Sequence, residues 1–369
     1  MSDAGLTERQ KHAIREGNTN AVRRCAADEM REESLHGRLV SDIYLETDPK
    51  YLLSPDDVSV GTADTTVESD VEGQQMMDAG DDIAEFSASY SVDHHYDHLF
   101  DANWQQQGDS EIAFVGTGIK GAHHLTSEAV ALIQAADKVL YCVADLVVER
   151  KIKLLNANCE DMYDLYGNEK PRRETYEGMV ERCLSALNEH KRVCVVYYGH
   201  PGIFVWPSYK AIQKARQKGV KAYMLPAVSS LDCLFADVGF DPSRYGCQIF
   251  EATDFVVRAK TPDISAAVIL LQIGCVGDLG FNFRGYDRRN MPVLIEYLSR
   301  FYGADYEAIV YEAAQYPLCQ PRIKRTALSE LGNANASGIT TLYLPPKLLP
   351  PVDKQMLERL GLQAPKFRE

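Results

Sequence analysis

The chain has 369 residues, of which 45% are hydrophobic and 25% charged, a composition typical of globular proteins with two or three domains. Its net charge of −14 disfavours nucleic acid as a partner, and no apolar stretch approaches the ~20 residues that a membrane-spanning helix needs. The N-terminus does not resemble a signal peptide and the nine cysteines form no CxxC pair, so we expect a cytoplasmic protein with free thiols.

The charge is distributed unevenly along the chain. Residues 1–110 contain 8 Lys and Arg against 24 Asp and Glu, whereas the remaining residues contain 31 against 29. Residues 51–110 contain no Lys or Arg at all. This change of composition predicts a domain boundary near residue 110.

Residues 1–32 are predicted to form a small helical element. Thr7 and Gln10 have the spacing of a capping box, Gly17 ends the first helix, and Asn18 or Thr19 caps a second one. The apolar face of this helix pair is small, so we expect it to pack against another part of the molecule.

Residues 33–110 are acidic and, in 61–82, typical of disorder. Apolar residues alternate with small or polar ones in Phe86–Val92, as in an extended segment. The His and Asp residues of 93–98 have ligand chemistry, but we interpret them as polar sequence rather than as a metal site.

From Glu111 onward the sequence is that of a packed α/β protein. The predicted strands are Ile112–Val115, Lys138–Val143, Val193–Tyr198, Lys221–Leu225, Cys247–Glu251, Ser265–Gln272, Ala308–Glu312 and Ile339–Leu344. The predicted helices are Thr126–Ala136, Asp145–Leu155, Arg172–His190, Tyr209–Lys218, Ser229–Val238, Pro292–Phe301 and Val352–Leu362. This alternation predicts a mostly parallel sheet covered on both faces, in two lobes at 111–205 and 206–347, followed by a tail at 348–369.

The most informative stretch is Val193–Ser208, a β-branched strand followed by the loop Gly199-His200-Pro201-Gly202. Such loops at the carboxyl ends of buried strands bind ligands in open α/β sheets, although an ordinary crossover turn has the same pattern. Gly116-Thr117-Gly118 is half of a dinucleotide fingerprint and indicates little by itself.

Several motifs in one order resemble the borosin peptide backbone α-N-methyltransferases of the omphalotin-precursor type, which have a tetrapyrrole-methylase-like fold. These motifs are the strand ending in Gly-Thr-Gly, Tyr198-Gly-His-Pro-Gly-Ile-Phe-Val, Met224-Leu-Pro-Ala-Val-Ser-Ser, Asp232-Cys-Leu-Phe-Ala-Asp, Glu251-Ala-Thr-Asp-Phe, Gln272-Ile-Gly-Cys-Val-Gly and Leu344-Pro-Pro-Lys. The resemblance covers about 111–362. It implies transfer of methyl groups from S-adenosylmethionine to backbone amide nitrogens of a peptide, with S-adenosylhomocysteine as the product.

The stretch from Asp161 to Tyr176 is similar to the catalytic segment of that family. The resemblance implies a catalytic set of Tyr166, Arg172, Tyr176 and Tyr198. Either Tyr166 or Tyr176 is expected to accept the amide proton, because a neighbouring arginine favours a phenolate. Each tyrosine taken alone is more often a core or rim aromatic.

The resemblance also implies cofactor contacts and no metal. The expected contact residues are Tyr198, His200, Ile203, Ser229, Ser230, Gln272, Ala313, Ala314, Thr340 and Thr341. Ala227 replaces a usual Gly and Ser230 a common Ala, and we expect only local adjustment at both positions.

In the fungal members of the family the substrate peptide follows the methyltransferase, whereas here the chain ends soon after Pro346. Residues 6–27 resemble the family's precursor-recognition element, so we expect leader, core peptide and enzyme in that order. The preferred core is Phe86–Val92, with Val58–Val67 and Val40–Leu45 as alternatives.

The resemblance implies an interlocked homodimer in which the peptide of one chain enters the active site of its partner. Two rival functions remain open: a small-molecule methyltransferase acting on a tetrapyrrole, and a catalytically idle member that binds a peptide.

Overall fold

A computed structural model describes residues 109–168, 170–282 and 285–362. The chain divides into two units, which we describe separately. The first continues to Asp237 and also contains Leu279–Gly285 and Ala313–Arg322. The second contains Val238–Asp278, Tyr286–Glu312 and the chain from Ile323 onward.

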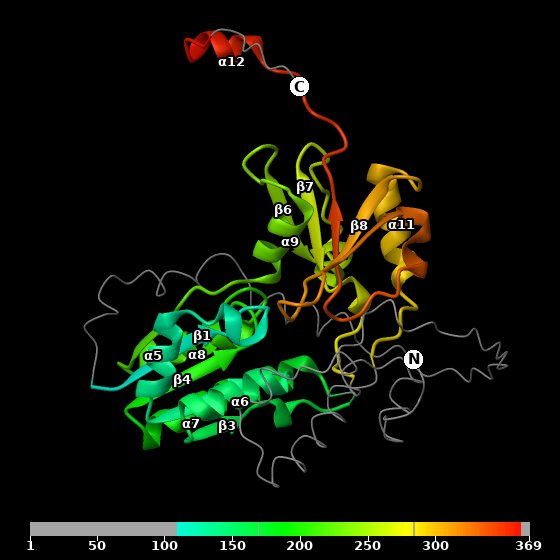
Figure 1. The fold of residues 1–369 in the computed structure, drawn as a ribbon. Helices are drawn as coiled ribbons and strands as arrows, with labels where there is room; N and C mark the ends of the chain where they lie inside the picture. Colours follow the sequence, from blue (N-terminus) through cyan, green and yellow to red (C-terminus); the bar gives the residue numbers. More distant parts are fainter. Residues whose placement is uncertain (1–108, 169, 283–284, 363–369) are drawn as a thin grey trace, which may run out of the picture. The chain divides into compact units, whose positions relative to one another are not determined.

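The first unit is built on a five-stranded sheet, in which every pair of neighbouring strands is parallel (Figure 1). The strand order is β3-β2-β4-β1-β5. The strands are β1 (Glu111–Gly116), β2 (Lys138–Cys142), β3 (Cys159–Asp161), β4 (Arg192–Tyr197) and β5 (Lys221–Met224). The central strands β1 and β4 have continuous buried apolar runs, as expected for a sheet that is covered on both faces.

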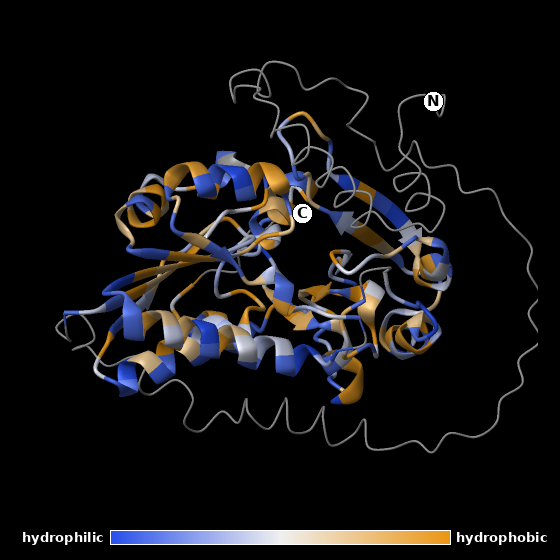
Figure 2. Cartoon of the chain, turned by 90° about the horizontal axis from the view of Figure 1, so that it is seen from below, coloured by the Kyte–Doolittle hydropathy of each residue, from blue (hydrophilic) through white to orange (hydrophobic). Residues whose placement is uncertain are grey.

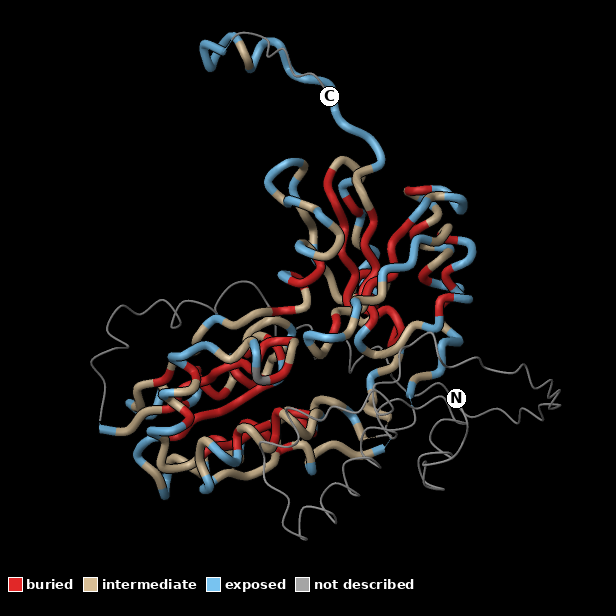
Figure 3. The backbone as a smooth tube through the Cα atoms, viewed as in Figure 1, coloured by how far each residue is buried: buried red, intermediate tan, exposed pale blue. Residues whose placement is uncertain are grey.

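Helices cover both faces of this sheet. The covering helices are α5 (Ser127–Ala135), α6 (Leu146–Leu155), α7 (Arg172–Glu189) and α8 (Trp206–Gln217), and α9 (Ser230–Val238) follows β5. Apolar residues of α7 and α8 share one buried cluster with the sheet, and those of α5 and α6 share another. Strands β1, β2 and β4 are mostly buried, whereas the helices turn a more exposed side outward (Figure 3).

The second unit has a mixed five-stranded sheet in the order β6-β7-β10-β8-β9. Its strands are β6 (Cys247–Glu251), β7 (Ala267–Leu271), β8 (Glu307–Glu312), β9 (Arg322–Ala327) and β10 (Thr341–Leu344). Strand β10 is antiparallel to both β7 and β8, and β6 is parallel to β7. Helices α10 (Ala252–Val257) and α11 (Met291–Tyr302) contribute to the apolar cluster of this unit. Figure 2 shows that hydrophilic and hydrophobic residues alternate along the helices. The last described helix, α12, spans Lys354–Arg359.

The alternating strand–helix pattern expected from the sequence is confirmed in the first unit. The mostly parallel sheet expected for the second unit is wrong, because β10 is antiparallel to both of its neighbours. Three elements were not expected. These are β3, β9 and α10. Strand β3 and helix α10 are short, and β9 is exposed and hydrophilic, so all three have weak hydrophobic periodicity. The structure places the division between the units after Asp237 rather than after residue 205. The reason is that α8 returns the chain to β5, which pairs with β1 in the same sheet.

The helical element at 1–32, the candidate core peptides and the His/Asp stretch at 93–98 lie outside the described residues. Among the residues that the structure describes, no helix is long and apolar enough to span a membrane.

Candidate functional site

Two loops meet at the carboxyl ends of β1 and β4, where the sequence predicted a ligand site. Gly118 N–H donates to Gly199 O at 3.2 Å, and Gly199 N–H donates to Gly118 O at 3.1 Å. Both glycines have positive φ, of 67° and 71°, which other residues rarely adopt. A side chain at Gly116 is excluded, because its Cβ would lie 2.0 Å from Gly199 O. The backbones of the two loops therefore approach each other as closely as glycine permits.

Ala227, one of the two departures from the family pattern, faces this same point. Its Cβ lies 2.7 Å from the position that a Cβ of Gly116 would occupy. The alanine methyl group therefore uses space left by the glycine, in agreement with the expected local adjustment. The second departure, Ser230, is the first residue of α9.

His200 is held in the loop after β4 by its own backbone. The N–H of Gly202 donates to His200 Nδ1 at 2.9 Å. Partial burial lowers the pKa of His200, while nearby Asp232 acts in the opposite direction. The imidazole is therefore neutral at neutral pH. Because Nδ1 accepts a hydrogen bond, Nε2 carries the proton and is the donor.

Ser229 organises the start of α9. Its backbone N–H and its hydroxyl both donate to Asp232 Oδ2 at 2.6 Å, and its Oγ accepts from Leu231 N–H at 3.2 Å. The side chain is buried and acts as a helix cap. This capping role explains why a serine suits the position, independently of any ligand.

Tyr198 and Ile203 complete the expected contacts on this loop. Tyr198 N–H donates to Cys142 O at 3.3 Å, which continues the β4–β2 pairing by one residue. Tyr198 has 37% of its surface exposed, and Ile203 is half-buried. Tyr198 and Ile203 follow β4, and Ser229 follows β5; these two strands flank β1. The five expected contacts up to Ser230 thus follow the two strands on either side of β1.

Arg172 and Tyr176 lie one turn apart near the start of α7, on the same side of the helix. A segment distant in the sequence holds this end of the helix. Arg172 N–H donates to Leu279 O at 3.1 Å, and its Nε donates to Gly280 O at 3.0 Å. Pro171 and Gly280 form an isolated bridge beside these bonds. Sequence reasoning did not identify Gly280, because nothing in its local pattern indicates a contact across 108 residues.

Tyr166 belongs to an aromatic group with Tyr163 and Phe281. Its ring centroid lies 4.5 Å from that of Phe281 and 5.2 Å from that of Tyr163. Tyr166 and Tyr176 pack against the same apolar cluster of the first unit. Burial raises the pKa of Tyr166 well above its ordinary value, and neighbouring Tyr176 adds to the effect. A phenolate favoured by an arginine was expected here, but at Tyr166 the structure gives the opposite direction, because loss of solvent dominates.

The second unit gathers three polar residues at one end of its sheet. Gln272 follows β7, Glu312 ends β8, and Thr340 precedes β10, which pairs with both strands. The Thr340 hydroxyl donates to Glu312 Oε1 and accepts from Ser337 N–H at 2.6 Å. The Ser337 hydroxyl donates to the same carboxylate oxygen at 3.1 Å. Thr340 is fully buried, so this network fixes its position.

Gln272 and Thr341 lie beside that network. Gln272 has a φ of 61°, a left-handed conformation that costs a non-glycine residue about 1 kcal/mol or more. The neighbouring Ile273 N–H donates to Thr340 O at 3.1 Å. Thr341 is the first residue of β10 and is buried. Such backbone strain is characteristic of functional sites.

Ala313 and Ala314 begin the segment that returns from β8 to the first unit. Ala314 is buried and Ala313 half-buried. The Tyr316 hydroxyl donates to the carboxylate of Asp145, which also caps α6 by accepting from Val148 N–H at 3.0 Å. This tyrosine is a second positioning residue that sequence reasoning missed.

The residues present fit a methyl donor of the S-adenosylmethionine type. In the first unit, His200 offers a neutral donor in the loop after β4. Thr340 and Glu312 supply oxygen atoms suited to hydroxyl and ammonium groups. Within the described residues, no group of three or more His, Cys, Asp or Glu is placed to hold a metal ion.

Comparison with known proteins identifies the family. The model of the tetrapyrrole (corrin/porphyrin) methylases matches residues 111–332. The chain belongs to this family. The two-lobed α/β fold expected from the resemblance is thereby confirmed for the methyltransferase region.

Within this methylase family, the chain is similar to fungal proteins named as methyltransferase/ribosomally synthesized cyclic peptide precursors. It is 40% identical over 264 residues to the gymnopeptides precursor of Gymnopus fusipes, covering 70% of this chain and 63% of that protein. It is 39% identical over 255 residues to the omphalotin A precursor of Omphalotus olearius, covering 68% and 61%. It is 43% identical over 256 residues to a type III borosin precursor of Anomoporia bombycina, covering 68% and 30%.

These matches confirm the resemblance to the borosin precursors that the motifs indicated. In each case the chain spans less than two thirds of the relative's own length.

Proposed function

We propose that this tetrapyrrole-methylase family member is an S-adenosylmethionine-dependent peptide N-methyltransferase that methylates backbone amides of its own N-terminal segment. The observation that supports it most strongly is the pair Arg172 and Tyr176 at the start of α7, with Tyr166 packed against the same apolar cluster as Tyr176, in a chain 40% identical to a methyltransferase that is also a peptide precursor.

The chemistry of an amide nitrogen explains why such a group is needed. The nitrogen lone pair is delocalised into the carbonyl group, so the amide is a poor nucleophile. Methylation requires that the N–H proton is removed while negative charge on the carbonyl oxygen is stabilised. A base and a fixed positive or hydrogen-bonding partner are therefore both required.

The raised pKa of Tyr166 separates the roles of the two tyrosines. Because Tyr166 stays a neutral phenol, its O–H suits hydrogen bonding to the amide oxygen rather than proton removal. We therefore assign proton acceptance to Tyr176, one helical turn from Arg172. The Arg172 guanidinium stabilises the developing charge, and its Nε bond to Gly280 O fixes its orientation. Tyr198, partly exposed at the end of β4, positions the peptide.

S-adenosylmethionine, when bound, supplies the electrophilic methyl group. In the first unit it would be held by Tyr198, His200, Ile203, Ser229, Ser230, Ala313 and Ala314. In the second unit it would be held by Gln272, Thr340 and Thr341. Because the polar groups of Ser229 already cap α9, its contribution is to hold the loop before α9 in place.

The substrate is proposed to lie in residues 31–110, with Phe86–Val92 as the preferred core and residues 1–32 as its leader. Joining substrate and enzyme in one chain replaces affinity with a high effective concentration. The proposal retains the cytoplasmic location and the homodimer, in which the peptide is methylated by the partner subunit.

The test is tandem mass spectrometry of the full chain after expression in cells. We expect methylated fragments from residues 31–110 in the wild type and none in Arg172→Ala. Methyl groups found only outside 31–110 would contradict the proposed substrate.

A second candidate is methylation of a tetrapyrrole, favoured by the family model that matches residues 111–332. Supplying labelled S-adenosylmethionine together with a tetrapyrrole distinguishes the two. Label in the tetrapyrrole, with an unmodified chain, would favour this alternative.

A further inference from the structure

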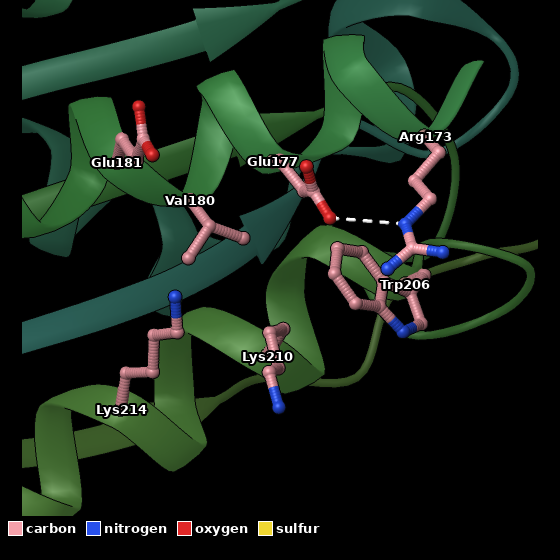
Figure 4. A pocket seen from close by; sticks show the side chains of 7 residues that line it. All are labelled: Arg173, Glu177, Val180, Glu181, Trp206, Lys210 and Lys214. Atoms are coloured by element: carbon pink, nitrogen blue, oxygen red, sulfur yellow. Dashed lines mark hydrogen bonds and ion pairs between the residues drawn. The ribbon is translucent and has the colours of Figure 1, made fainter. Parts of the chain in front are cut away.

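A groove of about 200 Å³ lies on the first unit between α7 and α8. It is lined by Arg173, Glu177, Val180, Glu181, Trp206, Lys210 and Lys214 (Figure 4). We call it the α7–α8 groove. Its floor is apolar where buried Val180 and half-buried Trp206 lie, and its rims are charged.

The charges of the groove are only partly paired. Arg173 Nε bonds Glu177 Oε1 at 3.0 Å, so Glu181 supplies the remaining charge of the α7 rim. On α8, Lys210 and Lys214 are one turn apart, and Lys218 caps the helix one turn further. We call these three the lysine row. Lys214 makes no hydrogen bond or ion pair with any residue that the structure describes. Like charges at this spacing repel each other, so the row attracts a chain of opposite charge.

The groove runs from the start of the described chain to the proposed catalytic residues. Helices α7 and α8 lead into β4 and β5, which are parallel to β1, so both helices run toward the edge where β1 begins. There Lys221 N–H donates to Ser110 O at 3.1 Å, which fixes the start of the described chain beside the end of α8. At the other end of the groove, Arg173 is next to Arg172 of the proposed catalytic group.

The sequence immediately before Ser110 matches this surface. Asp93, Asp97 and Asp101 recur every four residues, and so do the aromatic residues Tyr96, Phe100 and Trp104. On a helix these two rows would form one continuous stripe, acidic on one side and aromatic on the other. The lysine row has the same four-residue spacing as the aspartate row. Residues 93–104 contain no Lys or Arg.

We propose that residues 93–104 of the same chain dock as a helix in the α7–α8 groove, parallel to α8, with the aspartate row against the lysine row and the aromatic residues on Trp206 and Val180. Such a helix is about 18 Å long, similar to α8 from Trp206 to Lys218. The connector 105–109 reaches up to ~16 Å, enough to turn from Ser110 into the groove.

This docking places residue 93 at the end of the groove beside Arg173. The preferred core, Phe86–Val92, then extends from this end of the groove, from where it enters the active site of the partner subunit. This consequence rests on the proposed function, whereas the docking itself does not.

Zero-length carbodiimide cross-linking tests the docking in the full chain, because it joins a carboxylate to a lysine only in direct contact. Wild-type protein is made in normal and in 15N-labelled form, mixed, unfolded and refolded together so that the subunits redistribute, and then cross-linked and digested. We expect Asp97 or Asp101 linked to Lys210, Lys214 or Lys218, with both peptides carrying the same isotope. Mixed-isotope links would show that a second copy occupies the groove, and absence of these links would show that the segment does not dock. Either result overturns the proposal.

A charge exchange separates docking from the methylation chemistry. We expect Lys210→Glu with Lys214→Glu to lower the initial rate of methylation about tenfold, because tethering alone then presents the core. Adding Asp97→Lys and Asp101→Lys should restore the rate to within about twofold, a recovery that a merely structural role of the lysines would not give. Lys151→Glu with Lys191→Glu changes the net charge equally outside the groove and should leave the rate unchanged.

The same spectra keep the two hypotheses apart. Cross-links without any methylation would contradict the proposed function and support the docking. Methylation with unchanged rate in the charge-reversed variant would contradict the docking and support the proposed function.

Discussion

The two units hold the loops at the ends of their strands by different kinds of contact. In the first unit, the loops after β1 and β4 are held by contacts between glycine backbones, at Gly116, Gly118 and Gly199. In the second unit, the corresponding end of the sheet is held by side chains, through the Thr340–Glu312–Ser337 network and the left-handed Gln272. The first arrangement should not tolerate added volume, and the second should not tolerate lost polar atoms. Variants of the two kinds therefore distinguish what each unit contributes.

The largest effect should come from substitution of the proposed catalytic residues in the first unit. Arg172→Ala and Tyr176→Phe should each lower the methylation rate by ~100-fold or more, because one removes charge stabilisation and the other removes the proton acceptor. Mass spectrometry of time courses measures the rate, and calorimetry measures binding of S-adenosylmethionine, which should persist. Tyr245→Phe, in the second unit, is the matched control. Retained activity in Tyr176→Phe would remove the assigned acceptor.

Added volume is the next most damaging change. Gly116→Ala should lower the free energy of unfolding by about 2 kcal/mol or more, because the new methyl group would collide with Gly199 O. Gly178→Ala is the matched control within the same unit. Its Cβ meets Leu165 at an ordinary 3.5 Å, so it should be neutral or stabilise α7 by ~0.5–1 kcal/mol. Denaturant unfolding measures both; equal stability of the two variants would contradict the close backbone approach.

In the second unit, loss of a polar atom should affect cofactor binding more than chemistry. Thr340→Val keeps the shape but removes the hydroxyl that Glu312 and Ser337 share. We expect about 1–3 kcal/mol weaker binding of S-adenosylmethionine, with a nearly unchanged rate when the cofactor is saturating. Thr326→Val, whose hydroxyl makes a bond of only 3.4 Å, serves as the control. A lower rate at saturating cofactor, with unchanged affinity, would show that the network contributes to the chemical step rather than to cofactor binding.

The smallest effect should be a pH dependence from His200. Its pKa is lowered in the folded chain relative to 6.5, so below that pH the unfolded chain binds more protons. The stability contribution of the neutral imidazole is therefore present above 6.5 and lost as the pH falls toward the folded-state pKa. Thermal unfolding of wild type and His200→Gln between about pH 5 and pH 7.5 should show a steeper acid loss in the wild type. Parallel curves would show that this imidazole is not held neutral.

The elements of the fold were largely predictable because their signals are local. The apolar run of β4 and the helix over Thr126–Ala136 are encoded within a few residues and occur as predicted, with Thr126 as the cap of α5. The basic, exposed β9 and the six-residue α10 lack such periodicity. The candidate site was predictable only in part. Its motif residues were named, but the contacts that orient them join residues far apart in the chain.

Gly280 and Tyr316 illustrate this limit. Gly280 accepts from Arg172, and Tyr316 donates to Asp145 across 171 residues. A single sequence contains no signal for such pairs. The direction of the Tyr166 pKa shift depends likewise on burial among aromatic rings, which only packing determines.

The central claim is that this chain methylates main-chain nitrogens of its own N-terminal segment through the group at the start of α7. Fragmentation mass spectrometry of the full chain, expressed as wild type and as Arg172→Ala, tests it most directly. We expect methyl groups on backbone amides within residues 31–110 of the wild type and an unmodified segment in the variant. An unmodified wild-type segment, or the same methylation in both proteins, would contradict it.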